Sequence, residues 1–176
     1  MNEGELLKLV ARGDRAAFEE FYRRTSPWLA VRLRRRCADD EVVAEVLQDS
    51  YLAVWRAAGA FLGAGAGDSA LGWLWTIAAR RLVDAFRRRG RDGRALRPAS
   101  PEQAVPAAED TALDAMVGDP LWSALQQLAP ELRQVLQAMV LDGLTVRETS
   151  VLLGVPEGTV KTRARRARLE LREVLS

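Results

Sequence analysis

Residues 145–168 read TVRETSVLLGVPEGTVKTRARRAR, and this stretch decides the fold of the carboxy-terminal part of the chain. Thr145 and Glu148 have the spacing of a capping box, in which a hydroxyl and a carboxylate bind the free amides at a helix start. Gly154 stands where a tight turn needs a backbone conformation that side chains resist. Pro156 suits a first helical position, because its missing amide would be unpaired there. Together these signals predict a helix-turn-helix.

The second helix of this motif separates apolar from basic side chains. Its inner face is predicted to carry Val160, Ala164, Ala167 and Leu171. Its outer face is predicted to carry Lys161, Thr162, Arg165, Arg166 and Arg168. Such a helix fits the major groove of DNA, and the alternative is a terminal helix whose arginines are merely solvated. Because the basic residues fall opposite the apolar stripe, the pattern favours DNA binding.

The composition excludes several classes of function. The chain has 176 residues, 48% of them hydrophobic, which is enough for one medium domain or two small ones. It contains no histidine and one cysteine, Cys37, which excludes an internal disulfide, the usual zinc sites and histidine-based catalytic triads. We therefore expect no enzyme, no cofactor and no metal site. For Cys37 a buried structural thiol is expected, with redox sensing as the alternative.

The chain also lacks the sequence features of membrane insertion or secretion. No apolar run approaches the ~20 residues that span a bilayer. Met1–Arg12 contains acids and a lysine where a secretory signal would have a basic start and an apolar run. We therefore expect a cytoplasmic protein.

The charges are strongly segregated along the chain, although the formal net charge is only +2. Residues 87–97 form an arginine-rich block, and a second basic block occupies the last helix. Between them, residues 99–118 are rich in alanine, proline and acids and cannot build a core. We predict a domain over residues 1–90, a flexible acidic linker over 91–118 and a second domain over 119–176.

Helical periodicity dominates both domains, so the predicted fold class is all-α, with two small helical domains. Asp14 is expected to cap one helix, and Ser26 before Pro27 to begin another. Two more helices are expected over about 40–57 and 69–89, separated by a loop in which four glycines prevent helix continuation: Gly59, Gly63, Gly65 and Gly67. In the second domain, helices are expected to start at Asp119 and at Pro130, the latter stopping near Gly143.

Two helix faces in the first domain stand apart from the apolar stripes. In the helix over 40–57, Glu45, Gln48, Asp49 and Leu52 share one face. From the residues alone two interpretations remain open, a solvated acidic face or a docking surface for a basic partner helix.

In the helix over 69–89, Trp73 and Trp75 are offset by ~200° and cannot share a face, which predicts one exposed indole near several arginines. Such a surface suits unpaired bases. The alternative is that both indoles are core and the arginines only stabilise the helix end.

Three stretches, in this order, resemble signature regions of one known family. Residues 44–55, AEVLQDSYLAVW, resemble a polymerase-binding helix, and residues 72–80, GWLWTIAAR, resemble the start of a minus-ten helix. Residues 154–163, GVPEGTVKTR, followed by Arg166-Ala-Arg168, resemble a minus-thirty-five recognition helix. The chain is thus similar to bacterial RNA polymerase sigma factors of the extracytoplasmic function (ECF) class of the sigma-70 family.

The resemblance implies a function, partners and site residues. It implies promoter-specific transcription initiation, with sigma region 2 in the first domain and sigma region 4 in the second. The implied partners are core RNA polymerase, through the clamp helices of its beta-prime subunit and its beta flap, promoter DNA and an anti-sigma factor. The implied polymerase-binding residues are Glu45, Gln48, Asp49, Leu52 and Trp55. The implied minus-ten residues are Phe61, Asp68, Trp75, Arg80, Arg81, Asp84, Arg87 and Arg88. The implied minus-thirty-five residues are Glu157, Gly158, Thr159, Lys161, Thr162, Arg163, Arg165, Arg166 and Arg168.

The chain departs from the family pattern at two places. Residues 57–69 are rich in glycine and alanine where many relatives carry aspartate, proline and arginine, so the resemblance does not fix which base this loop reads. Ala164 and Arg165 replace a bulkier aliphatic residue and a histidine or aromatic residue. Two other functions remain to be distinguished, a stand-alone helix-turn-helix regulator and a sigma-like decoy that holds polymerase without initiating.

Overall fold

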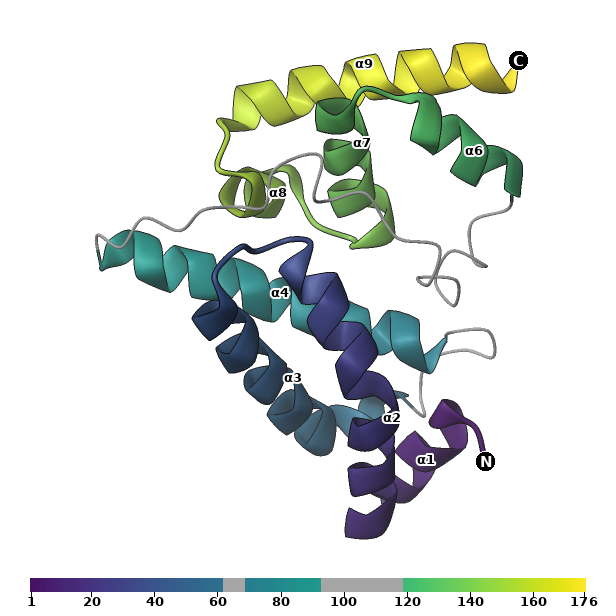
Figure 1. Cartoon of the computed structure of the whole chain (residues 1–176), viewed down its shortest axis with the longest axis vertical. Coiled ribbons are helices and arrows are strands. Elements are labelled where there is room, and N and C mark those ends of the chain that lie inside the picture. The colour runs from purple at the N-terminus through teal and green to yellow at the C-terminus, as the bar shows by residue number, and fades with distance from the viewer. Residues whose placement is uncertain (62–68, 93–118) are drawn as a thin grey trace.

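Helices form every regular element of the structure, a computed structural model that describes residues 1–61, 69–92 and 119–176. This confirms the all-α class. The amino-terminal group consists of α1 (Glu3–Val10), α2 (Arg15–Arg34), α3 (Asp40–Phe61) and α4 (Ala70–Arg91). The carboxy-terminal group consists of α6 (Asp119–Gln127), α7 (Pro130–Leu136), the π-helix η1 (Gln137–Leu141), α8 (Val146–Leu153) and α9 (Glu157–Leu175). The carboxy-terminal group lies along α4 on the side opposite α2 and α3 (Figure 1).

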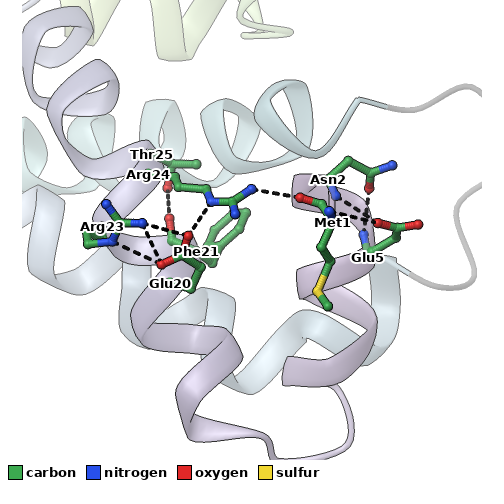
Figure 2. Close-up of polar contacts among 8 residues, drawn as sticks. All are labelled: Met1, Asn2, Glu5, Glu20, Phe21, Arg23, Arg24 and Thr25. Carbon is green, nitrogen blue, oxygen red and sulfur yellow. Dashed lines mark hydrogen bonds and ion pairs between the residues drawn. The ribbon is translucent and has the colours of Figure 1, made fainter.

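Helix α1 was not expected from the sequence, although the chain carries a signal for it. The Asn2 side chain accepts a hydrogen bond from the Glu5 amide, and the Glu5 carboxylate accepts one from the Asn2 amide, both at 2.8 Å. This is a capping box with asparagine in the place of serine or threonine. Figure 2 shows how Arg24 of α2 then holds the chain end, because its guanidinium donates to the Met1 carbonyl at 2.7 Å.

Helix α2 is continuous through Pro27, so the prediction of a new helix at Ser26 and Pro27 is wrong. Tertiary packing explains the difference. Thr25 is buried, donates to the Phe21 carbonyl at 2.7 Å and lies 2.6 Å from the Tyr51 hydroxyl of α3. These contacts fix the helical backbone immediately before the proline. Pro27 itself is exposed, as is Arg23, whose carbonyl loses its helical amide partner.

Helices α3 and α4 follow the predicted pattern, except that α3 continues for one more turn. Gly59 lies inside α3, so the prediction that it ends the helix is wrong. The extension is stabilised by Ala58, which is buried, and by Phe61, whose ring centroid lies 5.4 Å from that of Trp73. Ser69 caps α4 by accepting from the Gly72 amide at 3.1 Å. The remaining glycines of the predicted loop, at 63, 65 and 67, lie outside the described residues, as do residues 93–118 of the predicted linker. Arg91, predicted as the first linker residue, is instead the last residue of α4.

The helix-turn-helix formed by α8 and α9 agrees with the sequence in its main details. Thr145 and Glu148 make both hydrogen bonds of the capping box, each at 3.1 Å. Gly154 has φ 65° and ψ 31°, in the left-handed region, and Ser150 secures the turn by donating to the Val155 carbonyl at 2.6 Å. Pro156 precedes the first helical residue by one position. The turn is therefore held by local contacts that the sequence specifies.

We expect Gly154→Ala to lower the free energy of unfolding by about 1 kcal/mol, because a side chain in the left-handed region is strained. Gly59→Ala is the matched control. Gly59 is exposed within α3, and a methyl group there meets no atom within 4 Å, so this change should raise the free energy by about 0.5 to 1 kcal/mol. Urea denaturation of the full chain measures both. If Gly154→Ala were as stable as Gly59→Ala, the assigned turn would be wrong.

The two groups of helices share one apolar core. A single cluster of buried side chains joins Leu74, Trp75 and Leu82 of α4 to Val135 of α7 and Leu152 of α8. A smaller cluster fills the carboxy-terminal group: Leu125, Leu128, Leu132, Leu136 and Ala167. Helix α4 is therefore packed on both sides, and it lies between the rest of the amino-terminal group and the carboxy-terminal group.

Cys37 is 1% exposed, as expected for a structural thiol. Burial raises the pKa of this thiol above its usual value, which disfavours the reactive thiolate. In the described part of the chain, no helix has the length and apolarity needed to cross a membrane.

Candidate nucleic-acid interface and docking face

The outer side of α9 is a basic surface that the fold leaves accessible. Val160, Ala164 and Ala167 are buried, so the residues between them point away from the core. The exposed residues at the predicted recognition positions are Glu157, Gly158, Lys161, Thr162, Arg165, Arg166 and Arg168. Thr159 and Arg163 are half-buried. We call Lys161, Thr162, Arg165 and Arg168 the recognition face.

The recognition face is available for external partners. Arg166 is engaged within the helix, since its guanidinium lies 2.9 Å from the Glu170 carboxylate. Thr162 donates to the Gly158 carbonyl at 2.9 Å, which fixes its side chain over the first turn. A single helix that presents exposed cations beside a capped turn has the geometry required to contact phosphates and base edges in a major groove.

The end of α4 carries a second basic surface. A cleft of about 330 Å³ is lined by Arg81, Arg87, Arg88 and Arg91 together with Asp49 and Asp84, and we call it the arginine cleft. Arg80 is exposed nearby on the same helix. The Asp84 carboxylate lies 3.7 Å from the Arg87 guanidinium. With four guanidinium groups against two carboxylates, the arginine cleft is suited to phosphate groups.

The acidic face of α3 is accessible, as predicted. Gln48 and Leu52 are exposed, and the carboxylates of Glu45 and Asp49 are 40% and 38% exposed. Trp55 is 38% exposed and makes a T-shaped contact with the Phe18 ring, with centroids 5.3 Å apart. These five residues, the docking face, therefore combine accessible carboxylates with an apolar side chain, as a partner-binding surface requires.

The docking face and the arginine cleft are joined by ion pairs that sequence reasoning missed. The Arg88 guanidinium lies 2.9 Å from Glu45 and 3.8 Å from Asp49. Arg89, whose side chain is 14% exposed, reaches Asp39 at 3.3 Å and Glu45 at 3.9 Å. The paired residues are far apart in the sequence, by 43 positions for Arg88 and Glu45, so helix periodicity gives no signal for them. The two surfaces share charged groups and are not independent.

Trp75, which the resemblance implies as a minus-ten contact, is buried, since its side chain is 1% exposed. Trp73 is the more accessible of the two indoles and packs against Phe61. The Arg32 and Arg36 guanidinium groups lie over the Trp75 ring, and Asp142 of the carboxy-terminal group binds its N–H. The periodicity of α4 alone does not reveal these contacts. Asp68, which was predicted beside these residues, lies outside the described part of the chain.

Asp142 is the residue of the carboxy-terminal group that accepts the Trp75 indole N–H. It follows η1, where its amide donates to the Gln137 carbonyl at 2.9 Å, and it precedes Gly143, whose φ is 68°. This turn directs the carboxylate toward the amino-terminal group. One oxygen accepts from Trp75 Nε1 at 2.5 Å and the other from Arg36 Nε at 3.3 Å. We call Trp75, Arg36 and Asp142 the interdomain network.

Both halves of the chain match known protein families. The family model described as Sigma-70 region 2 matches residues 21–92, and the one described as Sigma-70, region 4 matches residues 119–171. The chain is 34% identical over 176 residues to the ECF RNA polymerase sigma factor SigM of Mycobacterium tuberculosis, covering 99% of this chain and 85% of that protein. It is 36% identical over 175 residues to the ECF RNA polymerase sigma factor SigK of Mycobacterium bovis, covering 97% of this chain and 91% of that protein. A solved structure of CnrH in complex with the cytosolic domain of CnrY is 23% identical, with a TM-score of 0.46, and covers 98% of this chain and 96% of that chain.

Proposed function

The chain belongs to the ECF class of the sigma-70 family. We propose which of its surfaces bind polymerase and which bind promoter DNA during promoter-specific initiation. As a sigma factor it binds core RNA polymerase and directs transcription from particular promoters. In our proposal residues 1–90 act as region 2, residues 119–176 act as region 4, and residues 91–118 connect them. The chain itself catalyses no reaction and works in the cytoplasm with the polymerase.

One observation carries this proposal. The same chain presents an accessible face of carboxylates and apolar groups and, on separate helices, two basic surfaces. A protein that only bound DNA would need the basic surfaces alone. The docking face adds a site for a macromolecular partner, which is what an initiation factor requires in order to bring polymerase to DNA.

We propose that the docking face binds the clamp helices of the beta-prime subunit. Glu45 and Asp49 steer a basic helix into place, and Leu52 and Trp55 supply apolar surface that becomes buried in the complex. Because Arg88 is paired with the same carboxylates in the free chain, polymerase binding competes with it. Arg88 is then released toward the DNA in the arginine cleft. The beta flap is the proposed contact of region 4.

We propose that the two basic surfaces read the two promoter elements. The recognition face enters the major groove at the minus-thirty-five element, supported by Glu157, Gly158, Thr159, Arg163 and Arg166. The arginine cleft, with Arg80, holds the backbone of the minus-ten element, and Phe61 and Asp68 are the further proposed contacts of its unpaired bases. An anti-sigma factor is a further proposed partner.

The experiment that tests this function compares DNA capture with and without polymerase. The tagged chain is mixed with a pool of fragmented genomic DNA, alone or with purified core enzyme, and the retained fragments are sequenced. We expect specific fragments to be enriched only when core enzyme is present. Equal enrichment by the chain alone would identify a stand-alone regulator and would overturn the proposal.

A further inference from the structure

Apolar side chains reach the surface where α2 packs against α3, beside the docking face. Tyr22 of α2 is 43% exposed, and Leu52 and Trp55 of α3 are 49% and 38% exposed. Phe18 of α2 is half-buried, and its ring centroid lies 5.3 Å from that of Trp55 and 6.3 Å from that of Tyr51. We call Phe18 and Tyr22 the aromatic edge. The docking face therefore continues as apolar surface from α3 onto α2.

The Tyr22 ring is held in place by the residues beneath it. It makes a T-shaped contact with the Tyr51 ring, with centroids 4.7 Å apart. Tyr51 is buried, its hydroxyl lies 2.6 Å from the Thr25 hydroxyl, and the buried Phe21 ring lies 6.2 Å from its own. Because these contacts fix Tyr51, Tyr22 presents a pre-organised ring, which loses little conformational freedom when a partner covers it.

The contiguity of these side chains distinguishes them from other exposed apolar residues. Val31 is also 43% exposed, but from Tyr22 to Val31 the helix turns by about 900°, so the two residues lie on opposite sides of α2. A single exposed aliphatic residue is ordinary on a protein surface. Phe18 and Tyr22 are one turn apart on α2, and Leu52 and Trp55 are one turn apart on α3. Such a continuous apolar surface indicates a partner-binding site.

The charges beside the aromatic edge identify the chemistry of the partner. Around α3, Trp55 and Asp49 are about 120° apart. Trp55 contacts α2, whereas Asp49 and Glu45 meet Arg88 of α4, so the surface is apolar toward α2 and acidic toward α4. Packed helices lie about 8 to 10 Å apart, and a helix with its side chains is about 10 to 12 Å wide. One partner helix that is apolar on one side and basic on the next can therefore cover both parts.

We propose that the aromatic edge is the apolar half of the polymerase-docking surface, where Tyr22 anchors the apolar side of the clamp helix whose basic side meets Glu45 and Asp49. This inference rests on the proposed function, because it takes the docking face to bind that helix. It adds α2 to the polymerase-binding elements. The two halves differ in their physics, since salt screens the attraction between charges but not the burial of apolar surface.

Tyr22→Ala in the full chain, titrated with core RNA polymerase, tests the aromatic edge. We expect the dissociation constant to rise about 30-fold, as for an aromatic anchor within an interface, and by the same factor at about 0.05 M and about 0.3 M salt. Tyr22→Phe keeps the ring and should bind within about threefold of the wild type. The loss caused by Glu45→Arg with Asp49→Arg should shrink at the higher salt. A loss for Tyr22→Ala that shrank in the same way would contradict an apolar contact.

Val31→Ala is the matched control, because Val31 has the same exposed fraction on the same helix but faces away from the docking face. It should bind within about twofold of the wild type. Circular dichroism establishes that each variant is folded. If folded Tyr22→Ala bound polymerase as well as Val31→Ala, the aromatic edge would have no part in docking.

Sedimentation of the chain without polymerase tests the other possible occupant, a second copy of this chain. We expect the wild type and Tyr22→Ala to sediment alike. A wild-type dimer that Tyr22→Ala dissociates would overturn the proposal.

Failure of this inference and failure of the proposed function give different results. If the charge-reversed variant were defective while Tyr22→Ala bound normally, the aromatic edge alone would be overturned. If core enzyme did not bind the wild type, the proposed function would be overturned as well.

Discussion

Reversing the charges of Glu45 and Asp49 together, as Glu45→Arg and Asp49→Arg, is expected to weaken binding of the chain to core RNA polymerase about 100-fold. Both carboxylates are about two-fifths exposed on the docking face and are available to a basic helix. Reversal replaces two attractive contacts with two repulsive ones, and like charges opposed in an interface cost several kcal/mol. A loss of about 3 kcal/mol corresponds to about 100-fold in the dissociation constant.

The charge reversal also disrupts an ion pair inside the chain. A further variant is needed to distinguish this effect from the loss of polymerase binding. In the wild type Arg88 is paired with Glu45 and Asp49, so the double variant brings like charges together between α3 and α4. Adding Arg88→Glu restores opposite charges across that contact without restoring the docking face. We expect this triple variant to be as defective in polymerase binding as the double variant.

Glu41→Arg is the matched control for the docking prediction. Glu41 lies on the same helix, its side chain is 83% exposed, and Arg89 reaches it at 3.9 Å, but it is outside the docking face. It should bind polymerase within about twofold of the wild type, since an isolated surface ion pair contributes little. Titration of the labelled chain with core enzyme at fixed salt gives the dissociation constants. Near wild-type binding by the charge-reversed variants would show that the docking face is misassigned.

Combining Lys161→Ala with Arg165→Ala is the second large change, and we expect it to reduce transcription from the chain's own promoters about 25-fold or more. The two residues are four positions apart, so they lie one helical turn from each other on the recognition face, and both are exposed. Neither forms an ion pair with another described residue, so replacing them should change the free energy of unfolding little. Each correct base contact contributes about 1 to 3 kcal/mol, or about 5- to 150-fold.

Two measurements assign this loss to promoter recognition. Polymerase binding by the double variant should stay at the wild-type level, because the docking face lies on α3. Arg172→Ala is the control, since Arg172 is exposed near the end of α9 but outside the predicted recognition residues. Run-off transcription compares the three proteins on each promoter. If the double variant transcribed every promoter as well as the wild type, the assignment of the recognition face to the major groove would be wrong.

The parts of the fold that the sequence predicted well are those held by local contacts. The capping box at Thr145 and Glu148, the left-handed Gly154 and the inward Val160 all act within a few residues of one another. Asn2 and Glu5 form a capping box of the same kind at the start of α1, with asparagine in the place of serine or threonine. Contacts between residues close in the sequence therefore determine these helix starts and this turn.

The incorrect predictions arose where distant residues decide the local structure. Pro27 ordinarily marks a helix boundary, but Thr25 of the same helix contacts Tyr51 and is held there. Trp75 lies on a different side of α4 from Trp73, but it is buried and its N–H binds Asp142, 67 positions away. The π-helical turn that aims Asp142 has no sequence signature of its own.

The sequence predicted which residues of the candidate site share a helix face, but not which residues of two different helices form ion pairs. The helical repeat places Glu45, Gln48, Asp49 and Leu52 on one side, and the structure confirms that this side is accessible. The repeat says nothing about which residue of another helix lies opposite. The ion pairs of Arg88 with Glu45 and Asp49 therefore emerged only from the packing of α3 against α4.

The central claim is that this chain confers promoter-specific initiation on core RNA polymerase. It is tested most directly by transcription of a fragmented genomic library with purified core enzyme, with and without the chain, followed by mapping of transcript starts. We predict a set of start sites that appears only with the chain and shares two upstream elements at constant spacing. Transcripts with the same start sites in both reactions, or no transcripts in either, would contradict the account.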